Sequence, residues 1–315
     1  MYPDIVFGAG AFNTQYNYDK LDDISEVLKC AIESGIVAID TAAFYGPSEI
    51  LVGEALAKLP FKREEYMLCS KCCRWENNEF EFSRDAVRRS VNRSLERLKS
   101  PYLDVLYIHD VEFGDPDQVI KAIEAAFELK RENIVRNVGI SGYPLDILLK
   151  CVKLVNEKLD DKLDCVLSYC NLTLQNNLLL EYEPKFKDLG VKYVLNASPL
   201  SMTLLRNDKT HDFHPAQPDL RARADKIGEE LQAEGLSYAT VALEYAFHAW
   251  KGKPTVLGLR TIEETKQALK DYKQGTKESN PVWGRVIAEF GEFHNVTWEE
   301  ELPKKVRHLW DALQI

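Results

Sequence analysis

The sequence lacks the features that mark membrane proteins and nucleic-acid-binding proteins. Among its 315 residues no apolar run approaches the roughly 20 residues that a transmembrane helix needs. Basic residues are outnumbered, at 40 Lys and Arg against 50 Asp and Glu, which gives a formal net charge of −10. A surface with this balance repels nucleic acid and anionic lipid. We therefore expect no nucleic-acid partner and no membrane partner.

A disulfide framework and a secretory leader are also missing. The seven cysteines form an odd-numbered, scattered set, which is typical of reduced thiols in a cytosolic protein. Cys69 and Cys72 have C-x-x-C spacing, but no second pair at zinc-site spacing and no thioredoxin-like pattern accompanies them. The N-terminus shows no charged region followed by an apolar one. These features predict a cytoplasmic protein with no metal site.

The glycine fingerprint of a doubly wound dinucleotide-binding sheet is incomplete. A short apolar segment, residues 5–7, leads into Gly8 and Gly10, but Asn13 stands where G-x-G-x-x-G requires its third glycine. The small residues around Gly10 and Ala11 still allow a ligand to approach the backbone. A doubly wound sheet is therefore the less favoured alternative.

What the sequence does contain is a regular alternation of short apolar runs and amphipathic helical stretches. The eight segments with strand character cover residues 5–7, 36–39, 66–71, 103–109, 138–141, 165–168, 193–197 and 255–257. Strands that alternate with helices in this way are typical of a parallel α/β barrel. We therefore predict an eight-stranded parallel (β/α)8 TIM barrel that forms a single domain over residues 1–315.

Two regions break the alternation. Residues 204–220 are polar and contain prolines, which predicts a long ordered loop of the kind that often covers a site in barrels. That loop fits a substrate lid and plain surface packing equally well. Residues 281–315 contain two further amphipathic stretches, which predict a helical tail at the C-terminus.

Polar residues stand at the ends of consecutive predicted strands. Asp40, Lys71 and His109 each end a different strand, and Tyr45 lies in the loop after the first of them. Because the strand ends of a parallel barrel converge at one mouth, these four side chains can meet there. Each of them taken alone also fits a structural role, such as a turn cap for Asp40 or a solvated strand end for Lys71.

Together the four side chains make an acid–base site. A tyrosine has a reference pKa of about 10, which is too high for ready proton exchange at neutral pH. A neighbouring ammonium favours the phenolate and lowers that pKa, and a carboxylate keeps the ammonium charged. We therefore predict that Tyr45, beside Lys71, transfers the proton and that His109 orients the same substrate oxygen.

With these residues in place the chain resembles the aldo-keto reductases, which are barrels that use a nicotinamide cofactor. Asp40, Tyr45, Lys71 and His109 are similar to the catalytic tetrad of that family, and the resemblance covers nearly the whole chain. It implies an oxidoreductase that works by hydride transfer.

The resemblance also implies a set of cofactor contacts. Residues 139–142 are similar to the family's G-x-S-N segment, with glycine in place of the asparagine that binds the carboxamide. Residues 197–200 resemble its Y-S-P-L segment, with alanine in place of the tyrosine that stacks on the nicotinamide. The implied cofactor-binding residues are Gly10, Ala11, Ser141, Ser168, Ser198, Leu200, Gly258, Arg260 and Glu264.

One of these residues bears on the choice of dinucleotide. By this resemblance Glu264 falls where NADP-preferring members carry an arginine for the 2′-phosphate. A carboxylate there repels a phosphate and accepts hydrogen bonds from free ribose hydroxyls, as in other dinucleotide-binding folds. We therefore expect NAD rather than NADP, although Arg260 could partly compensate. Glu264 also fits a solvated charge in the first turn of a helix.

Further segments resemble one branch of the family, the aldose 1-dehydrogenases, which includes fungal D-arabinose and plant L-galactose enzymes. These segments are residues 109–113, 167–172, 196–202 and 213–215. The branch implies a small-molecule sugar as substrate, D-arabinose or a related L-galactose or L-fucose type, oxidised at C1 to the aldonolactone. Phe12, Asp110 and Tyr143 are expected to line the substrate pocket, and Asp110 fits a turn residue equally well.

Two other functions stay open at this point. One is an NADP-dependent reductase of aldehydes or pyridoxal. The other is a non-catalytic regulatory subunit of the kind that associates with channels, against which the lack of a long N-terminal extension speaks. For the assembly we expect a monomer or a weak homo-oligomer.

Overall fold

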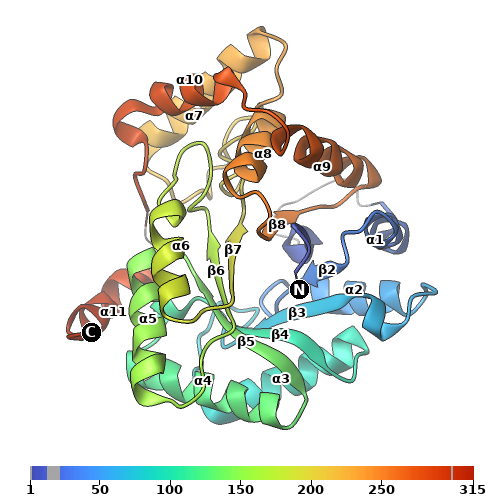
Figure 1. Ribbon diagram of the computed structural model, residues 1–315, viewed down its shortest axis with the longest axis vertical. Coiled ribbons are helices and arrows are strands. Elements are labelled where there is room, and N and C mark those ends of the chain that lie inside the picture. The colour runs from blue at the N-terminus through green and yellow to red at the C-terminus, as the bar shows by residue number, and fades with distance from the viewer. Residues whose placement is uncertain (1, 13–21, 299–300) are drawn as a thin grey trace.

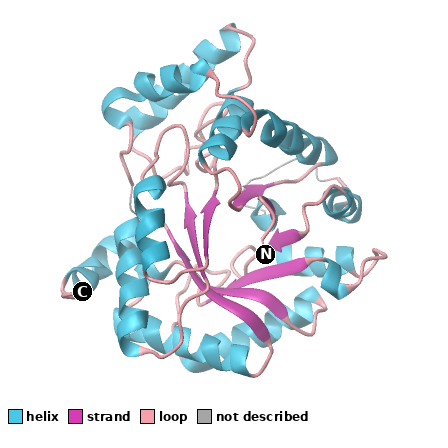
Figure 2. Ribbon diagram, viewed as in Figure 1, coloured by secondary structure: helices cyan, strands magenta, loops and turns pink. Residues whose placement is uncertain are grey.

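Eight parallel strands close into a barrel in chain order, as Figures 1 and 2 show. The computed structural model describes residues 2–12, 22–298 and 301–315. The strands are β1 (Ile5–Gly8), β2 (Ala38–Asp40), β3 (Met67–Cys72), β4 (Leu103–Ile108), β5 (Val135–Gly142), β6 (Cys165–Tyr169), β7 (Tyr193–Ala197) and β8 (Thr255–Gly258). β1 pairs with both β2 and β8, which closes the barrel. The predicted TIM barrel is confirmed.

The strand limits differ from the prediction by more than one residue at two places. β2 begins at Ala38 rather than at 36 and includes Asp40, which pairs with Gly8 of β1 and Cys69 of β3. β5 begins three residues earlier than expected because Val135 pairs with Leu103 at the start of β4. In both cases hydrogen bonding to a neighbouring strand determines where the strand begins. The local pattern of apolar residues does not reveal this pairing.

The helices lie outside the barrel, and most of them cover it. They are α1 (Ile24–Glu33), α2 (Ser48–Leu56), α3 (Arg84–Leu98), α4 (Pro116–Arg131), α5 (Leu145–Lys158), α6 (Leu179–Asp188), α7 (Pro218–Ala233), α8 (Tyr238–Ala249), α9 (Ile262–Gly275), α10 (Pro281–Phe290) and α11 (Glu301–Asp311). Short polar side chains begin several of them, since Ser83, Asp115 and Thr261 accept hydrogen bonds from backbone N–H groups of the first turn.

The long loop and the C-terminal tail lie near their predicted positions. α7 begins at Pro218 rather than at 221, because proline fits the first turn of a helix, so the predicted loop is shorter at its C-terminal end. The tail contains α10, a 3₁₀ turn at Gly291–Phe293 and α11. Figure 1 shows α7 and α10 beside each other at the top of the view, away from the strands. These helices pack around a separate apolar cluster that includes Trp283 and Trp298.

The core has two main layers that follow from the alternation of side chains along each strand. One layer lies between the sheet and the helices. The other fills the inside of the barrel and contains Cys69 and Tyr107, the residues two positions before Lys71 and His109. Lys71 and His109 therefore follow inward-facing residues on their strands. The seven cysteines are free thiols, and six of them are buried.

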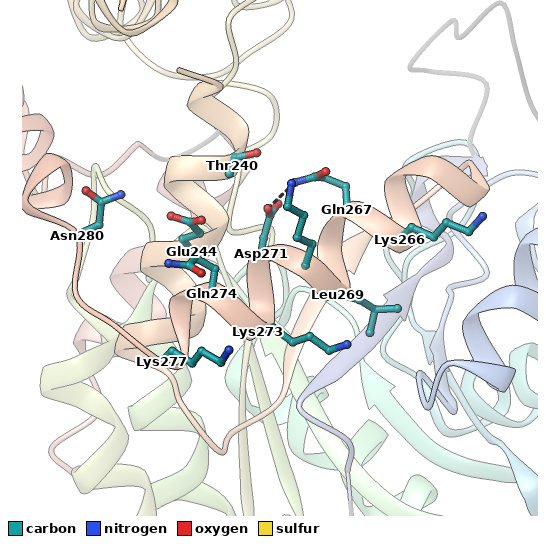
Figure 3. Close-up of a pocket in the computed structure, with 11 residues that line it drawn as sticks. Thr240, Glu244, Lys266, Gln267, Leu269, Asp271, Lys273, Gln274, Lys277 and Asn280 are labelled. Atoms are coloured by element: carbon teal, nitrogen blue, oxygen red, sulfur yellow. Dashed lines mark hydrogen bonds between the residues drawn. The ribbon is translucent and has the colours of Figure 1, made fainter. Parts of the chain in front are cut away.

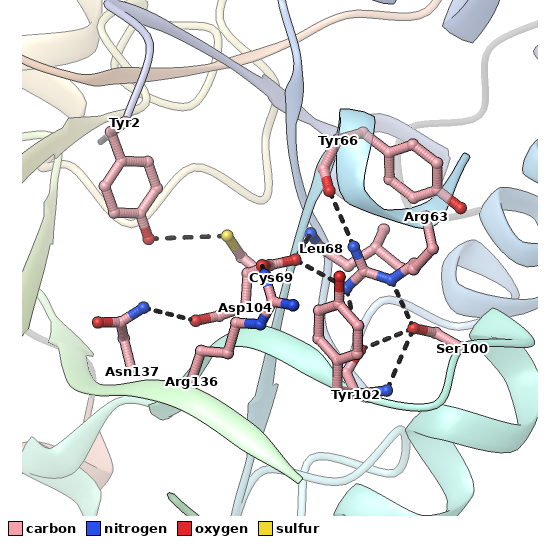
Figure 4. Close-up of polar contacts among 10 residues, drawn as sticks. All are labelled: Tyr2, Arg63, Tyr66, Leu68, Cys69, Ser100, Tyr102, Asp104, Arg136 and Asn137. Atoms are coloured by element: carbon pink, nitrogen blue, oxygen red, sulfur yellow. Dashed lines mark hydrogen bonds and ion pairs between the residues drawn. The ribbon is translucent and has the colours of Figure 1, made fainter. Parts of the chain in front are cut away.

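A polar network closes the N-terminal end of the barrel (Figure 4). Asp104 of β4 accepts a hydrogen bond from the Leu68 N–H at 2.9 Å, and its carboxylate pairs with Arg63 at 2.7 Å and Arg136 at 3.2 Å. The hydroxyl of Tyr2 lies 2.7 Å from the hydroxyl of Tyr107 inside the barrel. These contacts join β3, β4 and β5 at the end of the barrel away from the candidate site.

Replacing Asp104 with alanine is expected to lower the free energy of unfolding by about 3 kcal/mol, because it leaves a partly buried arginine and a backbone N–H without their carboxylate. Urea unfolding of the full chain measures this loss. The matched control is Asp161→Ala, which breaks an exposed pair with Arg131 and should cost less than about 1 kcal/mol. Equal losses in the two variants would show that burial does not determine how much the Asp104 contacts contribute to the free energy of unfolding.

Candidate active site

The four residues of the predicted tetrad meet at the C-terminal mouth of the barrel. The ammonium of Lys71 pairs with the Asp40 carboxylate and donates a hydrogen bond to the Thr41 carbonyl at 2.9 Å. The same ammonium lies 4.8 Å from the centre of the Tyr45 ring. The Tyr45 and His109 rings contact edge to face, with their centres 5.8 Å apart and their planes at 87°.

The loop that carries Tyr45 is held tightly at both ends. The Thr41 N–H donates to the Cys69 carbonyl at 2.9 Å, which continues the pairing of β2 with β3 beyond the strand. Ser48, at the start of α2, donates its hydroxyl proton to the Ala9 carbonyl at 2.8 Å. Between them Gly46 has φ +54, the left-handed region that glycine adopts without strain. The backbone of the loop is therefore fixed between β3 and the turn after β1.

Gly10 makes the space that the Tyr45 ring occupies. A Cβ atom on Gly10 would lie 3.2 Å from Cε2 of Tyr45, which is closer than such contacts usually are. The glycine predicted as a cofactor contact thus also lets the Tyr45 ring pack against the backbone. Gly10 and Ala11 both line the cavity described below.

Burial and charge act in opposite directions on the Lys71–Asp40 pair. Burial opposes the charge on Lys71, but Asp40 and Tyr45 outweigh it and raise the pKa of the lysine above its ordinary value. Burial also raises the pKa of Asp40, and Lys71 opposes that rise. Since the lysine side chain is only 2% exposed, its positive charge at neutral pH is directed into the site rather than screened by water.

The pKa of Tyr45 differs from the prediction. Burial raises it, and the lowering effect of Lys71 does not overcome that rise, to which Asp40 and Asp110 add. The expected net lowering toward the phenolate is therefore wrong for the chain by itself. The direction of the Lys71 effect is as predicted, and Tyr45 is a phenol at neutral pH.

His109 is a neutral hydrogen-bonding group. Burial lowers its pKa to about 3, so the imidazole carries no charge at neutral pH. Nδ1 has no hydrogen-bond partner among the described residues, and Nε2 lies 3.5 Å from the Asp110 carboxylate. A neutral imidazole supplies one donor and one acceptor, which suits the orientation of a substrate hydroxyl or carbonyl.

All four residues line one cavity of about 550 Å³, a size typical of small-molecule sites. The predicted cofactor-binding residues that also line it are Gly10, Ala11, Ser141, Ser198, Leu200, Gly258, Arg260 and Glu264. Asp110, predicted as a substrate contact, lines it as well. The cavity extends from the tetrad to the N-terminal turns of α9, so these positions share one continuous space.

Three predicted site residues lie outside this lining because other contacts hold their side chains. Ser168 is buried and accepts a hydrogen bond from the Asn171 amide at 2.9 Å. Phe12 packs in the core, with its ring centre 5.9 Å from that of Phe7. The Tyr143 hydroxyl accepts a hydrogen bond from the Trp298 N–H at 3.0 Å, and the Tyr143 ring stacks on Trp298. These three residues therefore do not line the cavity, and their predicted contacts with a ligand are not supported by its lining.

The lining includes residues that the sequence did not single out. Those with polar or aromatic side chains include Phe44, Arg74, Tyr169, Thr203, Arg206, Ser237, Thr240, Gln267 and Asp271. Part of this lining comes from the segment after β7, where Ser198, Ser201, Met202 and Thr203 all have positive φ. Non-glycine residues adopt that conformation at a cost and gather at functional sites, but no sequence pattern reveals it.

At the far end of the cavity Glu264 pairs with Arg260. The two charged groups are 2.5 Å apart, and the Arg260 N–H also donates to the Glu264 carboxylate at 2.8 Å. Thr261 caps α9 between them. Arg260 and Glu264 thus form a direct ion pair at the rim of the cavity.

A second groove between α8 and α9 continues from this end and is drawn in Figure 3. It shares Thr240, Gln267 and Asp271 with the cavity. The Gln267 amide donates to Asp271 at 2.6 Å, and burial raises the pKa of Asp271 to about 6. Figure 3 shows Lys266, Lys273 and Lys277 in the lining of the groove, together with the carboxylates of Glu244 and Asp271.

The cavity fits a dinucleotide. Three buried polar atoms of lining residues have no hydrogen-bond partner among the described residues: His109 Nδ1, Thr203 Oγ1 and Asp271 Oδ2. These atoms are spread from the tetrad to α9, so unpaired hydrogen-bonding groups lie along the whole length of the cavity. A long ligand with polar groups at both ends can use that capacity.

A tyrosine held beside a buried lysine–carboxylate pair, with a neutral histidine and a long cavity at the mouth of a parallel barrel, fits acid–base chemistry beside a bound dinucleotide. A family model described as "Aldo/keto reductase family" matches residues 4–280. The chain belongs to this family, whose members use nicotinamide cofactors.

Similar proteins agree with this assignment. The chain is 42% identical over 277 residues to D-arabinose 1-dehydrogenase of Saccharomyces cerevisiae, covering 85% of this chain and 82% of the yeast protein. It is 33% identical over 264 residues to L-galactose dehydrogenase of Arabidopsis thaliana, covering 83% and 81% of the two chains. The predicted resemblance to the aldose 1-dehydrogenase branch is thus confirmed.

Solved structures support the fold. The holo form of an aldo-keto reductase from Bacillus halodurans superposes with a TM-score of 0.68 at 21% identity and covers 95% of each chain. A family member from Pseudomonas aeruginosa gives a TM-score of 0.60 at 22% identity, covering 88% of this chain and 91% of that one. At these identities the similarity concerns the fold alone.

Proposed function

We propose that the protein oxidises an aldose at C1 to the aldonolactone, with NAD as the hydride acceptor. The observation that carries this proposal is the contact of Lys71 with both Asp40 and Tyr45 beside a neutral His109 in one cavity. The two similar proteins named above, a D-arabinose and an L-galactose enzyme, support a sugar as the substrate.

Each residue of the tetrad has a task in this reaction. His109 hydrogen-bonds the anomeric hydroxyl and fixes its orientation, and Tyr45 removes the hydroxyl proton. Lys71 stabilises the phenolate form of Tyr45, and Asp40 keeps Lys71 charged and in place. When bound, a nicotinamide cofactor would supply the hydride acceptor for C1. Ser141, Ser198 and Gly258 would hold the cofactor from the cavity wall.

The rate of sugar oxidation is expected to rise with pH from neutral toward the alkaline range. The reason is that proton removal needs the phenolate of Tyr45, whose pKa burial raises above its ordinary value. The pKa of His109, lowered to about 3, is too low to contribute an inflection near neutral pH. A profile of kcat against pH measures both effects. An inflection near pH about 6.5, the ordinary pKa of histidine, would show that His109 titrates in the working enzyme.

For the dinucleotide we infer NAD over NADP from Glu264, a carboxylate at the cavity rim near the N-terminus of α9. Glu264→Gln removes the charge that repels a 2′-phosphate and frees Arg260 from its ion pair. We expect kcat/KM with NADP to rise about tenfold, which corresponds to about 1.4 kcal/mol, and kcat/KM with NAD to stay equal or fall.

The matched control is Glu263→Gln, the same charge change at the neighbouring residue, which is exposed and does not line the cavity. It should leave the ratio of the two cofactors unchanged. A wild-type preference for NADP, or an equal shift in both variants, would contradict the assignment of Glu264.

A panel of aldoses tests the proposed function as a whole. D-Arabinose, L-galactose and L-fucose are each incubated with NAD, while absorbance follows the reduced cofactor and mass spectrometry follows the lactone. Oxidation of at least one of these sugars supports the proposal, and no turnover of any of them would overturn it.

No helix in the described part of the chain is long and apolar enough to cross a membrane. Cytoplasmic location and a monomeric or weakly associated state stay predictions.

A further inference from the structure

Beside the tetrad lies a charged pair, Arg74 and Asp110, that also lines the cavity. Asp110 follows His109 directly, and its Oδ2 lies 3.5 Å from Nε2 of His109. Any oxygen that His109 binds through Nε2 therefore has the Asp110 carboxylate next to it. Arg74 comes three residues after Lys71 and reaches the same place from the end of β3.

The guanidinium of Arg74 is fixed from several sides. It pairs with Oδ2 of Asp110 at 2.5 Å, and it donates to the Asn78 amide oxygen from Nε at 2.9 Å and from a terminal nitrogen at 2.7 Å. Its flat face lies 3.8 Å from the centre of the Phe44 ring. The side chain is 14% exposed, so the planar group is held before any substrate arrives.

Asp110 is held in an unusual backbone conformation. Its φ is +50, in the left-handed region, and its N–H donates to the Ser141 hydroxyl at 3.4 Å. Burial would raise the pKa of its carboxyl, but His109, Arg74 and Lys71 together lower it below the ordinary value. The carboxylate is thus ionised and acts only as an acceptor.

The pair suits a neutral substrate rich in hydroxyl groups. Its charges compensate each other, so it does not attract a charged ligand, yet it presents a carboxylate acceptor beside a guanidinium donor group. The hydroxyl on the carbon next to C1 lies about one hydrogen-bond length from the oxygen that His109 orients. Such a hydroxyl can donate to Asp110 while its oxygen faces the Arg74 group.

We propose that Arg74 and Asp110 form a subsite for the hydroxyl adjacent to the reacting carbon, and that Arg74 sets the preference for 2-hydroxylated substrates. The inference rests on the proposed function in that it assumes C1 to be the reacting carbon. Arg74 acts here both by holding Asp110 and by facing the substrate hydroxyl. Its removal is therefore expected to lower activity toward substrates that carry this hydroxyl and to spare those that lack it.

The test compares substrates that differ only near this position. D-Arabinose and 2-deoxy-D-ribose are a matched pair for oxidation, since 2-deoxy-D-ribose is D-arabinose without its C2 hydroxyl. Lactaldehyde (2-hydroxypropanal) and propanal, read in the reductive direction, are a second pair that does not depend on sugar oxidation. We expect Arg74→Met to lower kcat/KM about 100-fold for the hydroxylated member of each pair and less than about threefold for the other.

Two further variants separate recognition from a structural role. Arg74→Lys keeps the charge without the fixed fork and should recover part of the lost preference. Arg93→Met is the matched control, because Arg93 also packs on an aromatic ring, that of Trp75, but does not line the cavity. It should leave both substrate ratios unchanged.

The outcomes separate this inference from the proposed function. Equal losses for both members of each pair in Arg74→Met would give Arg74 a structural role only and overturn the inference, even if sugars are oxidised. If no sugar is oxidised while the lactaldehyde-to-propanal ratio still falls in Arg74→Met, the proposed function fails and the subsite stands.

Discussion

Replacing Tyr45 with phenylalanine is expected to lower kcat for sugar oxidation by about 1,000-fold, because it removes the oxygen that takes the proton and nothing else. The ring should still pack against Gly10 and His109, since these contacts involve carbon atoms of the ring. Cofactor affinity should therefore stay within about twofold of the wild-type value, which is a small energy on the scale of binding. Steady-state kinetics and a fluorescence titration with NAD measure the two effects.

The control for this variant is Tyr182→Phe, which removes a tyrosine hydroxyl on α6 from a ring that packs against Phe186 away from the cavity. Its kinetics should match those of the wild type. Retained turnover in Tyr45→Phe would show that another group takes the proton from the substrate. A large loss of NAD affinity would instead indicate that the variant distorts the cavity.

Replacing Lys71 with methionine is expected to lower both kcat and stability. Burial already raises the pKa of Tyr45, and the variant removes the Lys71 ammonium that opposes this rise, so kcat should fall about 100-fold or more. The Asp40 carboxylate is left buried without its partner, which should lower the free energy of unfolding by about 3 kcal/mol. Kinetics and urea unfolding measure the two losses separately.

A second substitution separates the two roles of Lys71. In the Lys71→Met background, Asp40→Asn replaces the unpaired carboxylate by a neutral amide and should recover part of the lost stability. It should recover none of the activity, because no cation returns to Tyr45. If activity returned together with stability, the result would show that Lys71 stabilises the fold and takes no part in the proton transfer.

The barrel and the tetrad could be predicted from the sequence because both depend on periodic patterns. The strand ends converge in a parallel barrel, so Asp40, Lys71 and His109 had to lie near one another once the strands were recognised. Gly258 and Ser198, which the family resemblance predicts as cofactor contacts, end or follow a strand and line the same cavity. The pattern of apolar residues predicts where the strands lie, and therefore where their ends meet.

Other features of the site depend on contacts that no pattern contains. Lys71 next to Tyr45 was visible in the sequence, but the burial that raises the Tyr45 pKa follows only from the packed structure. Ser168 has the right position on β6, yet Asn171 binds its hydroxyl, which depends on the course of the following loop. Arg74 meets Asp110 through the pairing of β3 with β4, across 36 positions of sequence.

The central claim is that this site moves a hydride from C1 of an aldose to the nicotinamide, and isotope transfer tests it most directly. The wild-type protein is incubated with NAD and D-arabinose that carries deuterium at C1, and mass spectrometry locates the label. The account predicts one deuterium on each reduced cofactor, an unlabelled lactone and a slower reaction than with the unlabelled sugar. Reduced cofactor without deuterium, or a lactone that keeps it, would contradict the claim.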